Sequence, residues 1–307
     1  MAKQYAILLG VEEVNSSNYG GAHYPFSAAG KSTTFFNSYF SELQNSKFEI
    51  LRPKGSEITS TFLLETLTKL KKEMTEGDIL VIYFCGHSFQ VLPEHSEWNL
   101  LHTDREDEGW GLYDRVFFHF ELWMAVKDFA IGSRIVILSD SCYSGITGFD
   151  YFSGMEKSAF SEISSKKLPW FVPNLLLYNT ILSSIQYVHL FDVKPSVIII
   201  GSSGERQVIA PGLGETRMTE FSVAFHCAVN NIPSPKNLVE LFDRINMHLI
   251  TFHPLNFSRV DPTRHPESFC SLSSEEYTRV LPKWHYHQGH KYTKLRTQTP
   301  LFKNENF

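Results

Sequence analysis

One histidine and one cysteine stand where they could act together on a substrate. His87 follows the apolar run 79–84, and Cys142 follows the apolar run 135–138. A thiol attacks a carbonyl carbon as the thiolate, and a neighbouring imidazole can take its proton and later return it to a leaving amine. The pair therefore predicts nucleophilic catalysis by cysteine. A core cysteine and an unrelated loop histidine are the alternative interpretation.

Small residues surround this cysteine in the segment Ser141-Cys142-Tyr143-Ser144-Gly145. Backbone amides exposed in such a turn could hold the oxyanion that forms when a carbonyl is attacked. One oxyanion donor is typically worth about 3 kcal/mol. These features favour the catalytic interpretation over the alternative.

The elements that must position the pair are apolar strands that alternate with amphipathic helices. The expected strands are 5–11, 48–51, 79–84, 135–138 and 197–200, and the expected helices are 30–44, 63–74, 118–129, 219–230 and 237–251. Thr59 or Ser60 is the expected N-cap of the second helix. This alternation predicts an α/β fold, with a mostly parallel sheet of about six strands and helices on both faces. Ligands bind such sheets outside the carboxyl ends of the strands, where His87 and Cys142 lie.

Length, charge and cysteine content narrow the class of protein. The chain has 307 residues, of which 42% are hydrophobic, so it can bury a large core. A net charge of −5 argues against general nucleic-acid binding. The chain shows neither an apolar run long enough for a membrane span nor the apolar core of a signal peptide. The cysteines fit neither a disulfide framework nor a zinc site, so we expect a cytoplasmic protein; they are Cys85, Cys142, Cys227 and Cys270.

Two motifs resemble those of a known family. Tyr83-Phe84-Cys85-Gly86-His87 is similar to the histidine motif of caspase-like cysteine proteases. Asp140-Ser141-Cys142-Tyr143-Ser144-Gly145 is similar to the cysteine motif of metacaspases and their bacterial relatives. The order of the two motifs and the 55 positions between His87 and Cys142 also fit. The resemblance extends through residues 110–115 and 202–207 and covers about residues 4–255.

The resemblance implies a caspase-like fold and a domain organisation. The catalytic domain would span residues 1–255, with an inserted segment at about 149–192. Residues 256–307 would form a C-terminal extension packed on the same domain. A cut within the inserted segment accompanies maturation in some members of the family, which makes Lys166-Lys167 a candidate self-cleavage point; a solvated turn is the alternative.

The resemblance also implies an activity. The protein would be a cysteine endopeptidase that forms a thioacyl intermediate, with Cys142 as the nucleophile and His87 as the general acid and base. The backbone amides of Cys142 and Ser88 would form the oxyanion hole. Ser88 stands where the family has glycine, and Tyr143 stands where metacaspases have histidine. A catalytically silent fold that serves as a binding module is the alternative.

Asp140 is the candidate specificity residue. Side chains alternate along a strand, so Asp140 should share a face with Cys142, and Cys85 should share one with His87. In metacaspase-like proteins the matching aspartate receives Arg or Lys at P1, the substrate residue before the cut bond, so we expect cleavage after Arg or Lys. Asp140 could instead cap the turn after its strand. The family's second pocket aspartate has no counterpart here, because Ala28-Ala29 stands at its place.

Other charged segments allow further interpretations. The acidic stretch 103–109 is expected to be an exposed loop; it could bind Ca²⁺, and its Asp104 could extend the cationic subsite. Glu205 could shape the substrate cleft or form a surface pair. The run of His285, His287 and His290 could bind a metal, although its segment is expected to be a loop. We expect a protein substrate and control by a regulatory protein partner, and we expect no cofactor.

Overall fold

The computed structural model describes residues 2–43, 47–91, 107–141, 174–183, 193–202 and 218–230. It also describes short pieces at 240–241, 244–245, 248, 268–269 and 285–287. Several residues singled out in the sequence lie outside these ranges, namely Asp104, Cys142, Lys166, Lys167, Glu205, Cys270 and His290.

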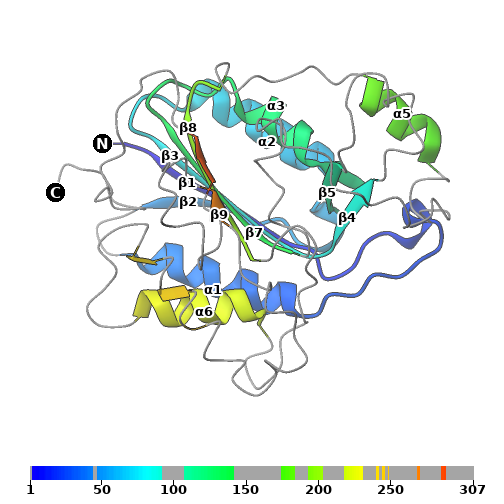
Figure 1. Ribbon diagram of the computed structural model, residues 1–307, viewed down its shortest axis with the longest axis horizontal. Helices are drawn as coiled ribbons and strands as arrows, with labels where there is room; N and C mark the ends of the chain where they lie inside the picture. The colour runs from blue at the N-terminus through cyan, green and yellow to red at the C-terminus, as the bar shows by residue number, and fades with distance from the viewer. Residues whose placement is uncertain are drawn as a thin grey trace, which may run out of the picture.

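A mostly parallel sheet forms the centre of the molecule (Figure 1). Its strands lie in the order β10-β8-β7-β3-β1-β2, and β9 also pairs with β8. The pairs β2/β1, β1/β3, β3/β7 and β7/β8 are parallel, whereas β9 and β10 are antiparallel to β8. The strands are β1 (Gln4–Gly10), β2 (Phe48–Leu51), β3 (Ile79–Cys85), β7 (Arg134–Asp140), β8 (Ser196–Gly201), β9 (Ser268–Phe269) and β10 (His285–His287).

Helices cover both faces of this sheet, which confirms the predicted fold class (Figure 1). On one face lie α1 (Ala28–Glu42) and α6 (Glu220–Asn230), and on the other lie α2 (Ser60–Glu73) and α3 (His119–Val126). Thr59 caps α2 as expected, since its hydroxyl accepts a hydrogen bond from the Phe62 amide at 3.1 Å. Other helices in the described ranges are η1 (Ser16–Tyr19), η2 (Gly55–Glu57) and α5 (Leu175–Ser183).

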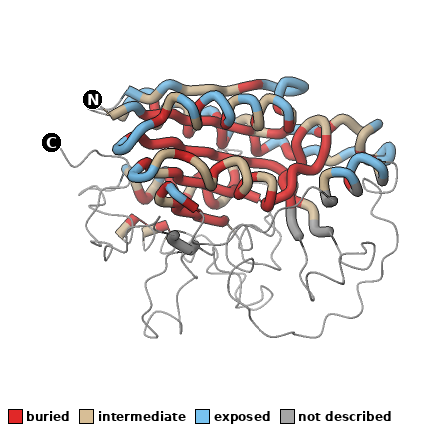
Figure 2. The backbone as a smooth tube through the Cα atoms, turned by 90° about the horizontal axis from the view of Figure 1, so that it is seen from above, coloured by how far each residue is buried: buried red, intermediate tan, exposed pale blue. Residues whose placement is uncertain are grey.

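The central strands are apolar throughout because both of their faces are covered. Every residue of β3 is buried, and so are six of the seven residues of β7. Figure 2 shows that the buried residues gather in the interior of the molecule, between layers that carry the exposed ones. Alternate side chains of β3 pack on opposite sides: Leu80 and Ile82 face α2 and α3, whereas Val81 and Tyr83 face α1 and α6. This two-sided burial produces the continuous apolar runs that predicted a parallel sheet.

A second sheet lies beside the carboxyl end of β3 and was not predicted. It contains β4 (Ser88–Val91), β5 (Asp107–Gly111) and β6 (Val116–Phe118) in antiparallel pairs. The expectation of a loop over 103–109 is therefore wrong at its end, because residues 107–109 belong to β5. The expectation of a loop around His285 is also wrong, since 285–287 form β10. Acidic residues and glycine disfavour strands intrinsically, and pairing with a neighbouring strand overrides that preference.

A buried histidine, His119, lies at the start of α3 and contacts β5 of the second sheet. It is 2% exposed, and neither ring nitrogen has a hydrogen-bond partner among the described residues. Its ring meets the Trp110 ring edge-on, with the centroids 6.0 Å apart. Burial disfavours the charged imidazolium and lowers the pKa of His119 to about 3.

His119→Phe should make the protein less sensitive to acid. The unfolded chain binds a proton at this histidine near pH 6.5, whereas the native protein binds it only near pH 3, so native stability falls as the pH falls through that window. Between pH 7 and pH 4 this one group should remove roughly 3 kcal/mol of stability from the wild type and none from the variant. Urea unfolding of both proteins at the two pH values measures the difference. An equal loss in both would contradict the assignment.

Candidate active site

His87 lies directly beyond the carboxyl end of β3. The intervening Gly86 lets the chain pass close to its neighbours: a Cβ there would lie 3.0 Å from the Phe84 ring and 3.2 Å from the Val11 Cβ. His87 itself is half-buried, and its ring is edge-on to the rings of Tyr24 and Phe26 at centroid distances of 5.9 and 5.1 Å. These contacts restrict the orientation of the imidazole.

A backbone carbonyl fixes the tautomer of this histidine. His87 Nε2 lies 3.2 Å from the Pro25 oxygen. A carbonyl can only accept a hydrogen bond, so Nε2 carries the hydrogen and Nδ1 carries the lone pair of the neutral ring. Nothing in the sequence pointed to Pro25, because any residue could supply a carbonyl at that place.

The protonation state of His87 suits a base. Burial lowers the pKa of His87, and the hydrogen bond to Pro25 opposes part of that shift. The imidazole is therefore neutral at pH 7, with Nδ1 able to accept a proton.

Ser88 presents its backbone amide away from the second sheet. It lies opposite Trp110 in the β4–β5 pair, and the Gly111 amide donates to the His87 carbonyl at 2.8 Å. This pattern makes Ser88 and Trp110 a non-hydrogen-bonded pair, in which the Ser88 N–H points away from β5. A serine at this place is thus compatible with an amide donor beside His87. Its side chain is buried, and the hydroxyl has no partner among the described residues.

Asp140 and Cys85 are direct neighbours. They are register partners at the ends of β7 and β3, and each is fully buried. Burial, followed by the Asp140 charge, raises the pKa of the Cys85 thiol well above its usual value, so this thiol stays protonated and unreactive.

Three hydroxyls hold one oxygen of the Asp140 carboxylate. Tyr83 donates to Oδ2 at 3.0 Å and Ser222 at 2.7 Å, and Thr219 also donates to it. Thr219 at the same time caps the start of α6, since its hydroxyl accepts from the Ser222 amide at 3.1 Å. These hydrogen bonds of Asp140 therefore link β7 to β3 and to the N-terminus of α6. None of the three comes from the turn that follows β7.

The other carboxylate oxygen has a different environment. Asp140 Oδ1 is buried without a hydrogen-bond partner among the described residues. Burial raises the pKa of Asp140 to about 6, although the bonds from Thr219, Ser222 and Tyr83 lower it in part. Ala28 and Ala29 are buried at the start of α1, so the position of the family's second aspartate holds no charge.

Most of the predicted active-site residues thus lie at the carboxyl edge of β3 and β7. His87, Ser88, Cys85 and Asp140 all lie there. Cys142 follows Asp140 by two positions and is outside the described residues, as are Asp104 and Glu205. Their predicted roles stay predictions.

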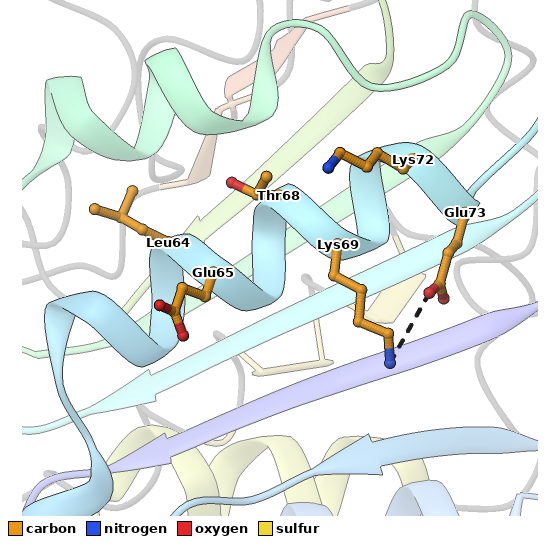
Figure 3. A pocket seen from close by; sticks show the side chains of 6 residues that line it. All are labelled: Leu64, Glu65, Thr68, Lys69, Lys72 and Glu73. Carbon is orange, nitrogen blue, oxygen red and sulfur yellow. Dashed lines mark ion pairs between the residues drawn. The ribbon is translucent and has the colours of Figure 1, made fainter.

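A surface hollow on α2 lies apart from this edge. Figure 3 shows its lining on the outer side of the helix, with Lys69 and Glu73 paired at 3.9 Å. The hollow holds neither a histidine nor a cysteine and is a solvated helix face; its lining is Leu64, Glu65, Thr68, Lys69, Lys72 and Glu73.

Within the described ranges, no group of three His, Cys, Asp or Glu side chains could hold a metal ion. Most of the possible calcium loop falls outside those ranges, and so does His290 of the histidine run, so both sites stay predictions. Among the described helices, none has the length and apolar character that crossing a membrane requires.

Comparison with solved structures supports the fold. The protein GSU0716 from Geobacter sulfurreducens superimposes with a TM-score of 0.70 and 20% identity, over 98% of each chain. At this identity the likeness shows a shared fold and nothing about activity. Caspase-1 from Spodoptera frugiperda superimposes with a TM-score of 0.44 and 9% identity, over 86% of this chain and 83% of the caspase, which is too weak to argue from. No protein-family model and no curated protein matches the sequence.

Asp140→Asn should change how stability varies with pH. The native carboxyl loses its proton near pH 6 and the unfolded one near pH 3.8, so the group destabilises the fold as the pH rises through that window. The asparagine carries no charge to bury. The variant should therefore gain up to roughly 3 kcal/mol relative to the wild type between pH 4 and pH 7. Urea unfolding across this range measures the gain, and a difference between the two proteins that is constant with pH would contradict it.

Proposed function

We propose that this protein is a cysteine endopeptidase of the caspase-like class, with Cys142 as the nucleophile and His87 as the general acid and base. The geometry of His87 is the observation that carries the proposal. Its Nε2 is bound to the Pro25 carbonyl, its Nδ1 is the basic nitrogen, and burial keeps the ring neutral at pH 7. The strand that leads to Cys142 ends beside it, because β7 is paired with β3.

The chemistry proceeds in two stages. His87 Nδ1 takes the thiol proton, Cys142 Sγ bonds to the substrate carbonyl carbon, and the carbonyl π electrons move to oxygen. The amides of Cys142 and Ser88 hold this oxyanion. When the carbonyl re-forms, the C–N bond breaks and His87 gives its proton to the leaving amine. Water then loses a proton to His87 as its oxygen bonds to the thioester carbon. When that carbonyl re-forms, the C–S bond breaks, the acid is released, and His87 returns the proton to the Cys142 thiolate.

The charge at the site favours a basic P1 residue. Asp140 stands at the edge where the substrate would bind, and its Oδ1 has no described partner, while hydroxyls hold Oδ2 in place. An ammonium or guanidinium group would satisfy this oxygen, whereas a substrate aspartate would be repelled. In this proposal Asp104 extends the cationic subsite, Glu205 shapes the substrate cleft, and Cys85 forms the wall of the subsite beside Asp140.

A binding module without catalysis is the second candidate. Leu176 and Leu177, neighbours on α5, are 83% and 44% exposed, and they would form part of the contact surface of such a module. The same surface could serve a regulatory partner of an active protease. A purified chain that is fully active without a partner or processing would refute such control.

Cys142→Ala should abolish peptide hydrolysis, and His87→Ala should strongly lower its rate. Loss of the acid and base removes roughly 10²–10⁴-fold in rate, and loss of the thiol removes the nucleophile. Hydrolysis of fluorogenic peptides with Arg or Lys at P1 measures the effect. His23→Ala is the matched control, because that histidine is exposed and pairs with Glu13. A His87→Ala protein as active as the His23→Ala protein would contradict the proposal.

Substrate choice should depend on Asp140. Peptides with Arg or Lys at P1 should be cut faster than peptides with Asp at P1, and Asp140→Asn should lower kcat/KM for the basic peptides by about tenfold or more, because a charge-assisted bond is lost. A library of peptides that differ only at P1 measures this preference. Faster cleavage after aspartate would show that the specificity proposal is wrong.

A further inference from the structure

The end of β7 is held by a second set of hydrogen bonds, on the face opposite Asp140. Trp110 Nε1 donates to Ser139 Oγ at 3.0 Å, and Ser139 Oγ lies 3.1 Å from Ser141 Oγ. All three side chains are fully buried. An indole N–H can only donate, so the Ser139 oxygen is held as its acceptor. Trp110 is itself fixed by stacking on Phe84, with the ring centroids 4.7 Å apart.

Ser202, which directly follows the neighbouring strand β8, binds the backbone at the end of β7. The Ser202 amide donates to the Ser139 carbonyl at 2.9 Å, and the Ser202 hydroxyl donates to the Ser141 carbonyl at 3.2 Å. Ser141 is therefore fixed through both its side chain and its carbonyl. Ser202 directly follows β8, whose register with β7 ends at Gly201 opposite Ser139, so its hydroxyl can reach the Ser141 carbonyl.

The Ser141 carbonyl shares a peptide unit with the amide of residue 142. A peptide unit is planar and trans, so its C=O and N–H point in opposite directions. A hydrogen bond that fixes the carbonyl direction therefore fixes the N–H direction as well. In the proposed mechanism this N–H is one of the two oxyanion donors.

We propose that Ser202, together with the Trp110–Ser139–Ser141 hydrogen-bond chain, positions the Ser141–Cys142 peptide so that its N–H faces the oxyanion. The inference rests on the proposed protease function and adds positioning residues to it. The developing negative charge appears on the substrate oxygen as the carbonyl π electrons move there, and a donor already aimed at it needs no reorientation during the reaction. The hydrogen bond from the Ser202 hydroxyl to the Ser141 carbonyl opposes rotation of the Ser141–Cys142 peptide unit away from this direction.

The test uses Ser202→Ala, with Ser139→Ala and Trp110→Phe as further variants of the chain. Ser133→Ala is the matched control, because it removes a buried hydroxyl bond at the opposite end of β7, from Ser133 to the Ala130 carbonyl at 2.7 Å. Three measurements are made on each protein: kcat and KM for a P1-Lys peptide, the inhibition constant of the matching peptide aldehyde, and the alkylation rate of Cys142 by iodoacetamide.

The aldehyde and iodoacetamide separate the oxyanion from the thiolate. An aldehyde forms a tetrahedral oxyanion with the thiolate, whereas iodoacetamide forms a C–S bond and releases iodide with no oxyanion at the carbon attacked. Ser202→Ala should lower kcat about tenfold, with KM little changed, and raise the aldehyde inhibition constant by a similar factor. Its alkylation rate should match that of Ser133→Ala.

Two results would overturn the inference while the protease proposal stands. One is a Ser202→Ala protein that equals Ser133→Ala in all three measurements. The other is an equal loss in hydrolysis, aldehyde binding and alkylation, which would show a displaced thiol rather than a displaced amide. A wild-type protein that hydrolyses no peptide and is not inhibited by the aldehyde would overturn the protease proposal and the inference together.

Discussion

The parallel pairing of β3 with β7 is the constraint on which the rest of the site depends. Its register sets Cys85 opposite Asp140. Because the two strands run in the same direction, the residues that follow them leave the sheet at one edge. His87 and the segment that leads to Cys142 therefore start from adjacent places, although 55 positions separate the two residues in the sequence. A slip of one residue would turn Asp140 to the opposite face.

The end of β7 is held differently on its two faces. Towards α1 and α6, Asp140 accepts from Tyr83, Thr219 and Ser222, and these bonds join the strand to the start of α6. Towards α2 and α3, Ser139 and Ser141 continue the hydrogen-bond chain from Trp110. A buried polar group that loses its hydrogen bond costs free energy, so these bonds favour one arrangement of the edge. A rigid edge of this kind suits a site whose donors must be aimed before the reaction starts.

The sequence predicted the elements whose side chains carry a clear pattern. Apolar runs identified β1, β2, β3, β7 and β8, and the leucine spacing with Thr59 identified α2. The second sheet was missed because β5 consists of acidic residues, glycine and one tryptophan, and only its partners make it a strand. The contact of Pro25 with His87 was not predicted, because every residue has a backbone carbonyl and its type does not show which one binds the imidazole. The hydroxyls on Asp140 come from α6 and β3, and only the folded chain brings them together.

The central claim is that His87 and Cys142 meet at the carboxyl edge of the sheet. A bifunctional alkylating agent such as 1,3-dibromoacetone tests it directly, because its short three-carbon bridge can join only a thiol and an imidazole in contact. Mass spectrometry of the digested protein should show the Cys142 peptide bridged to the His87 peptide, and His87→Ala should leave Cys142 modified without a bridge. Wild-type protein in which Cys142 reacts but is never joined to His87 would contradict the account.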